Sequence, residues 1–256
     1  MIGLFDSGLG GLTVVRRVRE RLPNADLVFF SDQAHVPYGS RTPQNLFELV
    51  QTNLAWLDDQ GVDAIVMACN TSCAIADHFG WPQARATVLD LLDSATRALE
   101  LGRHRRIGVV ATAATVNSGA YGRRIRAGIP HAEVFEVAAP ALVPLVEAGN
   151  IDGDETREAV RDVCAQLPTD LDAVVLACTH YPILETHFAA ALGADVPLID
   201  PAIVQAERVA ELLGDHANES GRTRYVTNAD LDAFHRNVAR ITGDPNPDTQ
   251  GIPTPV

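Results

Sequence analysis

Short apolar runs alternate with longer amphipathic segments along almost the whole chain. Eight runs have the length and composition of buried strands. They are Ile2–Phe5, Asp26–Phe30, Ala64–Ala68, Thr87–Leu91, Ile107–Ala111, Val134–Val137, Ala173–Ala177 and Pro197–Ile199. Strands separated in this way by helical segments are typical of an α/β protein with mostly parallel sheets.

The best delimited helix has Thr42 as its N-cap and Pro43 as its first residue, and it stops at Gly61. Further helices are predicted at Leu12–Arg21, Asn117–Ala127, Asp154–Gln166 and Ala202–Leu213. The charged stretch Leu101–Arg106, just before a strand, indicates a domain junction. Residues 243–256 contain four prolines and no apolar periodicity, so we expect a loose tail without a chemical role.

Length and cysteine content limit the class of protein. A chain of 256 residues corresponds to one or two domains. Its apolar runs are far shorter than the roughly 20 residues of a membrane span, and its first residues do not resemble a signal peptide. Four cysteines are too few for a disulfide framework in a chain of this size. We therefore expect a soluble protein of the reducing cytoplasm.

The charged residues exclude several functions. All 20 basic residues are arginines, set against 33 Asp and Glu, for a net charge of -13. Without lysine, the chain cannot form the Schiff base of a pyridoxal phosphate enzyme or build a P-loop. An acidic chain is also poorly suited to binding nucleic acid. We expect no nucleic-acid partner and no membrane partner.

One internal repeat directs attention to two cysteines. Residues 63–69 read DAIVMAC and residues 172–178 read DAVVLAC, identical at five of seven positions. Polar residues follow Cys69 and Cys178 directly, so both thiols are predicted at the carboxyl ends of strands, where open α/β folds bind ligands. The alternative is that either cysteine is only a small buried apolar residue. For Cys73 and Cys164, core packing is the preferred interpretation.

A metal site is a second alternative for these residues. Cys69, Cys73, Cys178 and His180 could be combined into a zinc site. Structural zinc sites usually contain two close pairs such as C-x2-4-C, whereas the second pair here would be C-x-H. The spacing therefore argues against a metal.

Other predicted strand ends also carry polar side chains. The first strand leads into Asp6, Ser7 and a glycine-rich turn that could bind an anion, although Asp6 could equally cap the following helix. The turn GLGG is not a dinucleotide fingerprint. Two further strand ends supply Asp32, His35, Tyr38, Gly39 and Ser40, and Thr112, Thr115 and Ser118. Turn formation and helix capping are the structural alternatives there.

Together these strand ends offer two thiols, two carboxylates, a histidine and neutral donors, with no cofactor motif. Such a set suits acid–base chemistry on a small anionic molecule. Two bases on opposite faces of one carbon would interconvert mirror images.

Six motifs, in order from Phe5 to Pro182, carry a family resemblance: FDSGLGG, DQAHVPYG, ACNTSCA, ATAATVNSGAY, LVPLVEAG and ACTHYP. The chain resembles cofactor-independent glutamate racemases of the aspartate/glutamate racemase superfamily. The resemblance implies two similar open-sheet α/β domains in a pseudo-twofold relation, with the active site in the cleft between them. We place residues 1–97 and 207–256 in the first domain and residues 98–206 in the second.

The resemblance also implies site residues. Cys69 matches the cysteine that acts on the D-enantiomer, and Cys178 the one that acts on the L-enantiomer. Carboxylates and a histidine would assist these thiols: Asp6, Asp32, Glu147 and His180. The substrate would be held by Ser7, Pro37, Tyr38, Gly39, Asn70, Thr71, Thr112, Thr115 and Thr179. The resemblance implies no metal and no cofactor. It does imply that the protein supplies D-glutamate for peptidoglycan and that it forms a homodimer.

Two departures from the family pattern stand out. Gln33 replaces a common threonine, and the pair Ser72–Cys73 replaces a pair of smaller residues. Neither position is a predicted base.

A free thiol has a pKa near 8.5, so something must favour its ionised form. A protonated His180 could do so for Cys178, and Asp6 could accept a proton from Cys69 or from the substrate ammonium. The sequence leaves these options open.

Three rival functions remain at this stage. They are racemisation of aspartate or another acidic amino acid, binding of acidic amino acids without turnover, and protein interaction through an acidic surface. Retention of both cysteines argues against the silent binding protein. Net charge alone supports the third, and a solvated surface explains that charge equally well.

Overall fold

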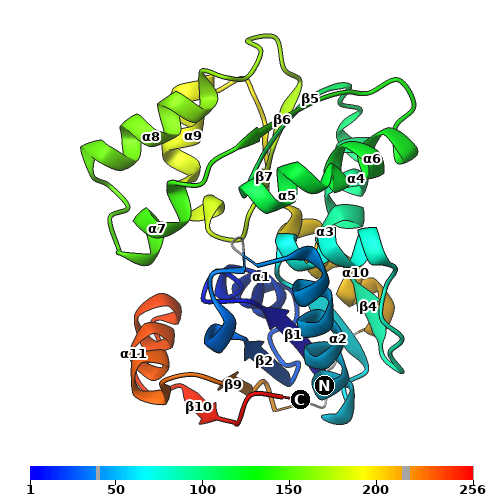
Figure 1. Ribbon diagram of the computed structural model, residues 1–256, viewed down its shortest axis with the longest axis vertical. Helices are drawn as coiled ribbons and strands as arrows, with labels where there is room; N and C mark the ends of the chain where they lie inside the picture. Colours follow the sequence, from blue (N-terminus) through cyan, green and yellow to red (C-terminus); the bar gives the residue numbers. More distant parts are fainter. Residues whose placement is uncertain (39–40, 215–219, 256) are drawn as a thin grey trace.

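The computed structural model describes residues 1–38, 41–214 and 220–255, which form two domains built on parallel sheets (Figure 1). The larger sheet has the order β10-β9-β2-β1-β3-β4, and the smaller has the order β6-β5-β7-β8. The larger consists of β1 (Ile2–Asp6), β2 (Leu27–Ser31), β3 (Ala64–Met67), β4 (Thr87–Leu89), β9 (Thr223–Thr227) and β10 (Asp248–Gly251). The smaller consists of β5 (Arg106–Ala111), β6 (Glu133–Ala138), β7 (Ala173–Ala177) and β8 (Leu198–Ile199). The predicted fold class is confirmed.

Helices cover both faces of each sheet. Those of the first domain are α1 (Leu12–Arg21), α2 (Pro43–Asp59), α3 (Asn70–Phe79) and α11 (Leu231–Thr242), with α4 (Leu91–Gly102) and α10 (Pro201–Leu213) at the crossings between domains. The second domain contains α5 (Ala113–Ser118), α6 (Ala120–Gly128), α7 (Leu142–Glu147), α8 (Asp154–Cys164) and α9 (Glu185–Leu192). Two 3-10 turns follow strands, η1 (Gln33–His35) and η3 (Tyr181–Leu184).

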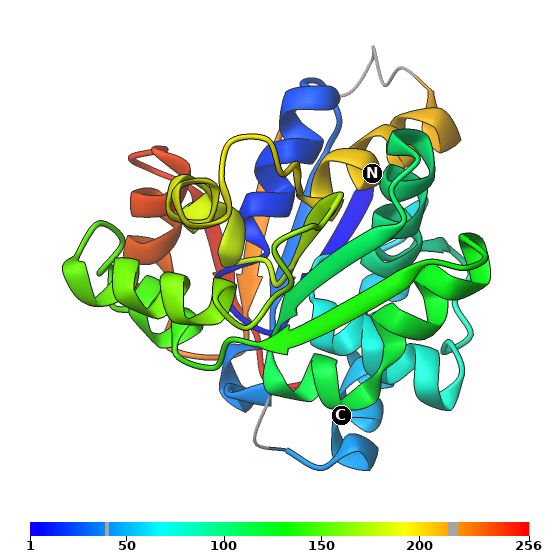
Figure 2. The same cartoon turned by 90° about the horizontal axis from the view of Figure 1, so that it is seen from above.

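Two-sided coverage explains the unbroken apolar runs of the central strands. Every residue of β1, β2, β3 and β7 is buried, as expected for parallel strands between two helical layers. In the larger sheet, α1, α10 and α11 pack on one face, and α2 and α3 on the other. In the smaller sheet, α4, α5 and α6 lie on one side, and α8 and α9 on the other (Figures 1 and 2).

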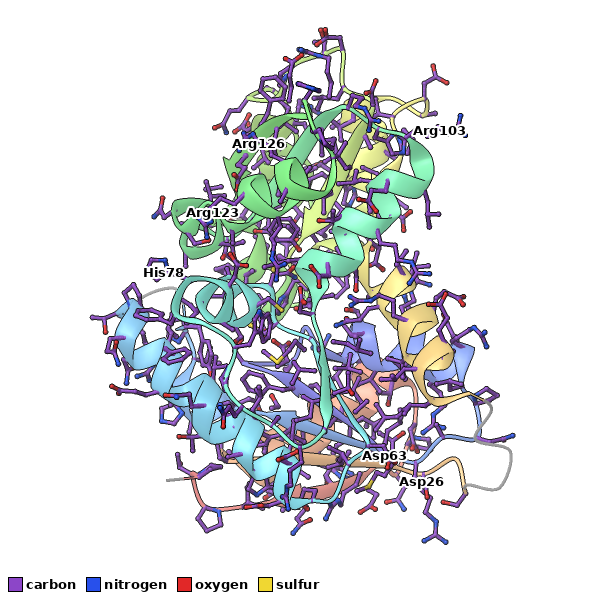
Figure 3. All side chains as sticks on the ribbon, turned by 90° about the vertical axis from the view of Figure 1, so that its right-hand side faces the viewer. Asp26, Asp63, His78, Arg103, Arg123 and Arg126 are labelled. Atoms are coloured by element: carbon purple, nitrogen blue, oxygen red, sulfur yellow. The ribbon has the colours of Figure 1, made fainter. Side chains whose placement is uncertain are left out.

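The carboxyl ends of the two sheets face each other. Asp26 and Asp63 directly precede β2 and β3, and both lie at the end of the first domain that is far from the second (Figure 3). Arg103, shortly before β5, lies toward the opposite end of the molecule. The residues that follow β1, β3, β5 and β7 therefore meet between the domains, where open α/β folds bind ligands.

The predicted strands are confirmed to within two residues at each end. The helix with Thr42 as its N-cap is also confirmed, since the Thr42 hydroxyl accepts a hydrogen bond from the backbone N of Asn45. The single helix predicted at Asn117–Ala127 is wrong. It is replaced by α5 and α6, which are divided at Gly119, a residue with a positive φ of 64°.

The prediction of a loose tail at residues 243–256 is wrong as well. Asp248–Gly251 forms β10, which pairs in parallel with β9. Main-chain hydrogen bonds hold this edge strand, and its side chains are mostly exposed, so it needs no apolar periodicity. Within the described part of the chain, no helix combines the length and apolar character needed to cross a membrane.

Candidate active site

The repeated cysteines occupy equivalent places in the two domains. The strand order β2-β1-β3-β4 of the larger sheet matches the order β6-β5-β7-β8 of the smaller one. Cys69 follows β3 as the N-cap residue of α3, and Cys178 follows β7. Both are free thiols with 5% and 6% of their surface exposed. One thiol from each domain is thus present at the facing sheet ends.

Cys69 lies beside the residues that follow β1. Its Sγ is 3.4 Å from Oγ of Ser7. Burial, followed by the negative charge of Asp6, raises the pKa of Cys69 to about 12. The Cys69 thiol is therefore protonated at neutral pH.

Asp6 is a buried carboxylate at the end of β1. It accepts hydrogen bonds from the backbone N of Ser7, at 2.7 Å, and from that of Gly11. Burial raises the pKa of Asp6 to about 6, although the positive charge of His180 and these backbone donors oppose the rise. A carboxyl with this pKa can gain and lose a proton near neutral pH.

Cys178 has a different acid–base partner. Nδ1 of His180 lies 3.8 Å from Sγ of Cys178, and Nε2 lies 2.6 Å from Oε1 of Glu147. Burial lowers the pKa of His180, but the interactions with Cys178 and Glu147 outweigh it and raise this pKa to about 10. The ring is thus an imidazolium at neutral pH, and a cation beside a thiol stabilises the thiolate.

Neutral hydroxyls from both domains meet near the thiols. Oγ1 of Thr71 is 3.2 Å from that of Thr112 and 3.4 Å from that of Thr115. Thr112 is the N-cap residue of α5. Asn70, next to Thr71, accepts a hydrogen bond from the hydroxyl of Tyr121 in α6. These groups can hold a carboxylate without competing for its proton.

The loop after β1 (residues 7–11, called the β1 loop) and the first turn of α1 contact the second domain directly. Oγ1 of Thr13 donates to the backbone O of Thr179 at 3.0 Å. A Cβ at Gly10 would overlap the Thr179 hydroxyl and the His180 ring. Only glycine permits this close approach of the domains.

Asp32 and Tyr38 form a neighbouring cluster. Tyr38 donates a hydrogen bond to the fully buried Asp32. Burial and the charge of Asp32 raise the pKa of Tyr38 well above its usual range, and the charges of Cys69 and Asp6 add to the rise. Tyr38 therefore lies within electrostatic reach of the site. Pro37 is exposed, and Gly39 lies outside the described residues.

A cavity of about 890 Å³ opens beside the site, between α1 and α11 of the first domain and α7 and η3 of the second. Its lining includes Thr13, Val146, Ile183 and Arg240, and neither catalytic candidate thiol is part of it. Both thiols are nearly buried.

Four polar or small residues of this region were not singled out from the sequence: Gly10, Tyr121, Asn53 and Asn228. Gly10 and Tyr121 belong to the motifs FDSGLGG and ATAATVNSGAY, which carried the signal. Asn53 and Asn228 belong to none of the six motifs, because their partners are distant in the chain. Among the described residues, no group of three or more His, Cys, Asp or Glu side chains could hold a metal ion.

The geometry gives each domain one thiol with its own acid–base partner, and places neutral donors between them. Such an arrangement can move protons on and off a carbon whose carboxylates are held by hydroxyls and amides.

Comparisons with known proteins agree with this chemistry. The model of the family described as Asp/Glu/Hydantoin racemase matches residues 12–209. A curated glutamate racemase from Gloeobacter violaceus is 46% identical over 214 residues, which cover 83% of this chain and 80% of that protein. The chain belongs to the Asp/Glu/hydantoin racemase family.

Solved structures of family members share the whole fold. Glutamate racemase from Thermus thermophilus, in complex with beta-chloro-D-alanine, aligns with a TM-score of 0.85 and 33% identity, over 98% of this chain and 96% of that one. Glutamate racemase from Francisella tularensis, in complex with D-glutamate, aligns with a TM-score of 0.88 and 27% identity, over 99% and 97%. The racemase family members and this chain therefore have the same two-domain architecture.

Proposed function

We propose that this protein is a glutamate racemase, which interconverts L- and D-glutamate by two-base proton transfer at the α-carbon and uses no cofactor. The observation that carries the proposal is the pair of thiols at equivalent strand ends of two facing domains, each with its own acid–base partner. Relatives named glutamate racemase, one of them solved with D-glutamate, support glutamate as the substrate.

In the L-to-D direction, we assign the role of base to Cys178, which lies beside the His180 imidazolium. Acting as a thiolate, it takes the α-proton of L-glutamate, and the electron pair of the broken C–H bond delocalises into the α-carboxylate. The Cys69 thiol, whose raised pKa keeps it protonated at neutral pH, then donates its proton to the opposite face of the carbon. The products are D-glutamate, a Cys69 thiolate and a Cys178 thiol.

In the D-to-L direction, Cys69 must become the base. Asp6, with a pKa of about 6, is ionised at neutral pH and lies close enough to affect the Cys69 pKa. We assign to Asp6 the task of accepting the proton that Cys69 loses. Cys178 must then begin as a thiol, with a proton taken from solvent, so that it can protonate the opposite face of the carbon after Cys69 has removed the α-proton of D-glutamate. Glu147 stays paired with His180 and maintains the positive charge that Cys178 needs.

Neutral donors hold the substrate in this scheme. We assign substrate binding to the hydroxyls and amides of Ser7, Asn70, Thr71, Thr112, Thr115 and Thr179, with Tyr38 beside them. Because negative charge develops on the α-carboxylate as the proton leaves, donors aimed at that group stabilise the transition state more than the ground state.

Several broader assignments accompany this proposal. We assign residues 1–97 and 207–256 to the first domain and 98–206 to the second, with crossings within α4 and α10. A cytoplasmic location is supported by four free cysteines. Supply of D-glutamate for peptidoglycan and assembly as a homodimer rest on membership of the racemase family.

Proton NMR in D2O tests the reaction. Reduced protein is incubated without cofactor with L-glutamate, D-glutamate or L-aspartate in separate samples, and both the α-proton signal and the optical rotation are followed. Loss of both signals with the two glutamate enantiomers, and neither with aspartate, supports the proposal.

Loss of both signals with aspartate alone would keep the two-thiol chemistry and replace the substrate. If folded, reduced protein leaves the α-proton signal and the optical rotation of all three amino acids unchanged, racemase activity is refuted and a binding protein is favoured.

A further inference from the structure

Asp32 is surrounded by four hydrogen-bonding side chains from three parts of the chain. Oδ1 of Asp32 accepts a hydrogen bond from Nδ2 of Asn228 at 2.6 Å and lies 2.6 Å from Nδ1 of His35. Oδ2 accepts hydrogen bonds from Nδ2 of Asn53, at 2.9 Å, and from the hydroxyl of Tyr38. Each carboxylate oxygen therefore has two partners, which uses all of its ordinary acceptor capacity.

The two asparagines anchor this carboxylate to separate elements. Asn53 belongs to α2 and is almost fully buried. Asn228 follows β9, and its Oδ1 also accepts a hydrogen bond from the backbone N of Ala34 at 3.0 Å. Asn228 thus forms two hydrogen bonds with the segment after β2, one to the Asp32 side chain and one from the Ala34 main chain.

Tyr38 connects this cluster to the site. Its hydroxyl contacts Asp32 and lies 3.3 Å from Nδ2 of Asn53. The ring is 4% exposed. Displacing Asp32 would therefore leave the Tyr38 hydroxyl without its charged acceptor and free the ring to turn away from the site.

We propose that Asn228 and Asn53 are positioning residues, which lock Asp32 in place so that Asp32 holds Tyr38 in the wall of the substrate site. In this arrangement the role of Asp32 is to orient other groups, because its acceptor positions are already filled. The inference rests on the proposed function, since it uses turnover of glutamate as its readout.

Substitution of Asn228 tests the inference because its side chain is only partly buried. N228A removes both contacts and is expected to raise KM for both glutamate enantiomers about tenfold or more, as expected for loss of a hydrogen bond to a charged group, while kcat changes less. The matched control is D230A. Asp230 lies two residues away and caps α11 through the backbone N of Ala233 at 2.7 Å, without touching Asp32. D230A is expected to lower the melting temperature and leave KM unchanged.

N228D separates hydrogen bonding from space filling. Aspartate has the shape of asparagine, but it places a second carboxylate against Asp32 instead of a donor. If Asn228 positions Asp32, N228D has a higher KM than N228A; if Asn228 only fills space, N228D resembles the parent protein. N53D repeats the comparison from the α2 side.

Two results overturn the inference while leaving the proposed function intact. One is an active parent protein whose N228A variant keeps its KM, and the other is an N228D variant that is milder than N228A. A parent protein that leaves both glutamate enantiomers unchanged would overturn the proposed function and this inference together.

Discussion

Cys69 and Cys178 occupy equivalent strand ends in the two domains, but their neighbouring side chains differ. Cys69 has a carboxylate and a hydroxyl as neighbours, so its proton is held tightly. Cys178 has a cationic imidazole as its neighbour, itself paired with Glu147. The two thiols thus have neighbours of opposite charge, which suits Cys69 to the proposed role of acid and Cys178 to that of base.

Substitution of either thiol tests its role. C69S and C178S are each expected to lower kcat/KM by about 100-fold or more, because loss of a general acid or base typically costs that much. C164A is the control, since Cys164 lies in α8 and packs in the core of the second domain. Racemisation rates from circular dichroism provide the measurement. A C69S variant with parental activity would remove Cys69 from the mechanism.

The pH profile follows from two shifted groups. Asp6 must be ionised to accept a proton, so activity should fall as pH drops below about 6. His180 must be protonated, so activity should fall as pH rises toward about 10. A profile of kcat/KM from pH 5 to 10.5 should be bell-shaped, since this ratio reports the groups of the free enzyme.

Removal of a charge should move one side of that profile. In E147Q the negative charge that raises the pKa of His180 is gone, so the alkaline side should shift to lower pH while the acid side stays. An alkaline side that stays in place in E147Q would contradict the role given to Glu147.

At the scale of elements, the β1 loop packs closely against the second domain at Gly10. Gly10 lies against Thr179 and His180, and it has no space for a side chain. G10A is expected to lower kcat/KM by about 10- to 100-fold, since small misplacement of reacting groups is costly. The control is G8A, because a Cβ there would lie 3.8 Å from Cγ2 of Val36. Equal activity of the two variants would show that this contact does not govern closure.

The carboxyl-terminal strand contributes to stability. Beyond its pairing with β9, the backbone N of Ile252 donates to the O of Thr227 at 2.9 Å, and His235 in α11 contacts Thr249 at 2.8 Å. Deletion of residues 243–256 is expected to lower the melting temperature by about 5 °C or more. Deletion of residues 254–256 serves as the control and should have little effect. A full deletion without thermal cost would restore the interpretation of this segment as a loose tail.

The elements show where sequence patterns are informative. Central strands such as β1 and β7 are buried on both faces, so their composition alone marks them. The strand β10 is an exposed edge of sequence DTQG, which only its pairing with β9 stabilises. Likewise, Asn228 meets Asp32 across 196 positions of the chain, and no local pattern encodes that contact. The thiols could be located because a repeat marked them, and motifs marked their neighbours Asp6, Glu147 and His180. Asn53 and Asn228 could not be located in this way.

At the scale of the molecule, contacts between α3 and α6 also join the two domains. Asp77 of α3 pairs with Arg123 and Arg124 of α6, at 3.0 and 2.7 Å. Figure 3 shows Arg123 of the second domain close above His78 at the end of α3. These ion pairs add a charged contact between the domains to the neutral contact between Thr71 and Thr112.

The matching strand orders of the two sheets have one more consequence. A chain of L-amino acids cannot build a mirror plane, but two sheets with matching strand orders give each domain one thiol at an equivalent strand end. The match is imperfect, since Cys69 is followed by the long helix α3 and Cys178 by the short turn η3. Enantiomers have equal free energies, so kcat/KM must be the same in both directions. The structural difference between the two domains can therefore affect kcat and KM for the two enantiomers, but the ratio of the two kcat values must equal the ratio of the two KM values.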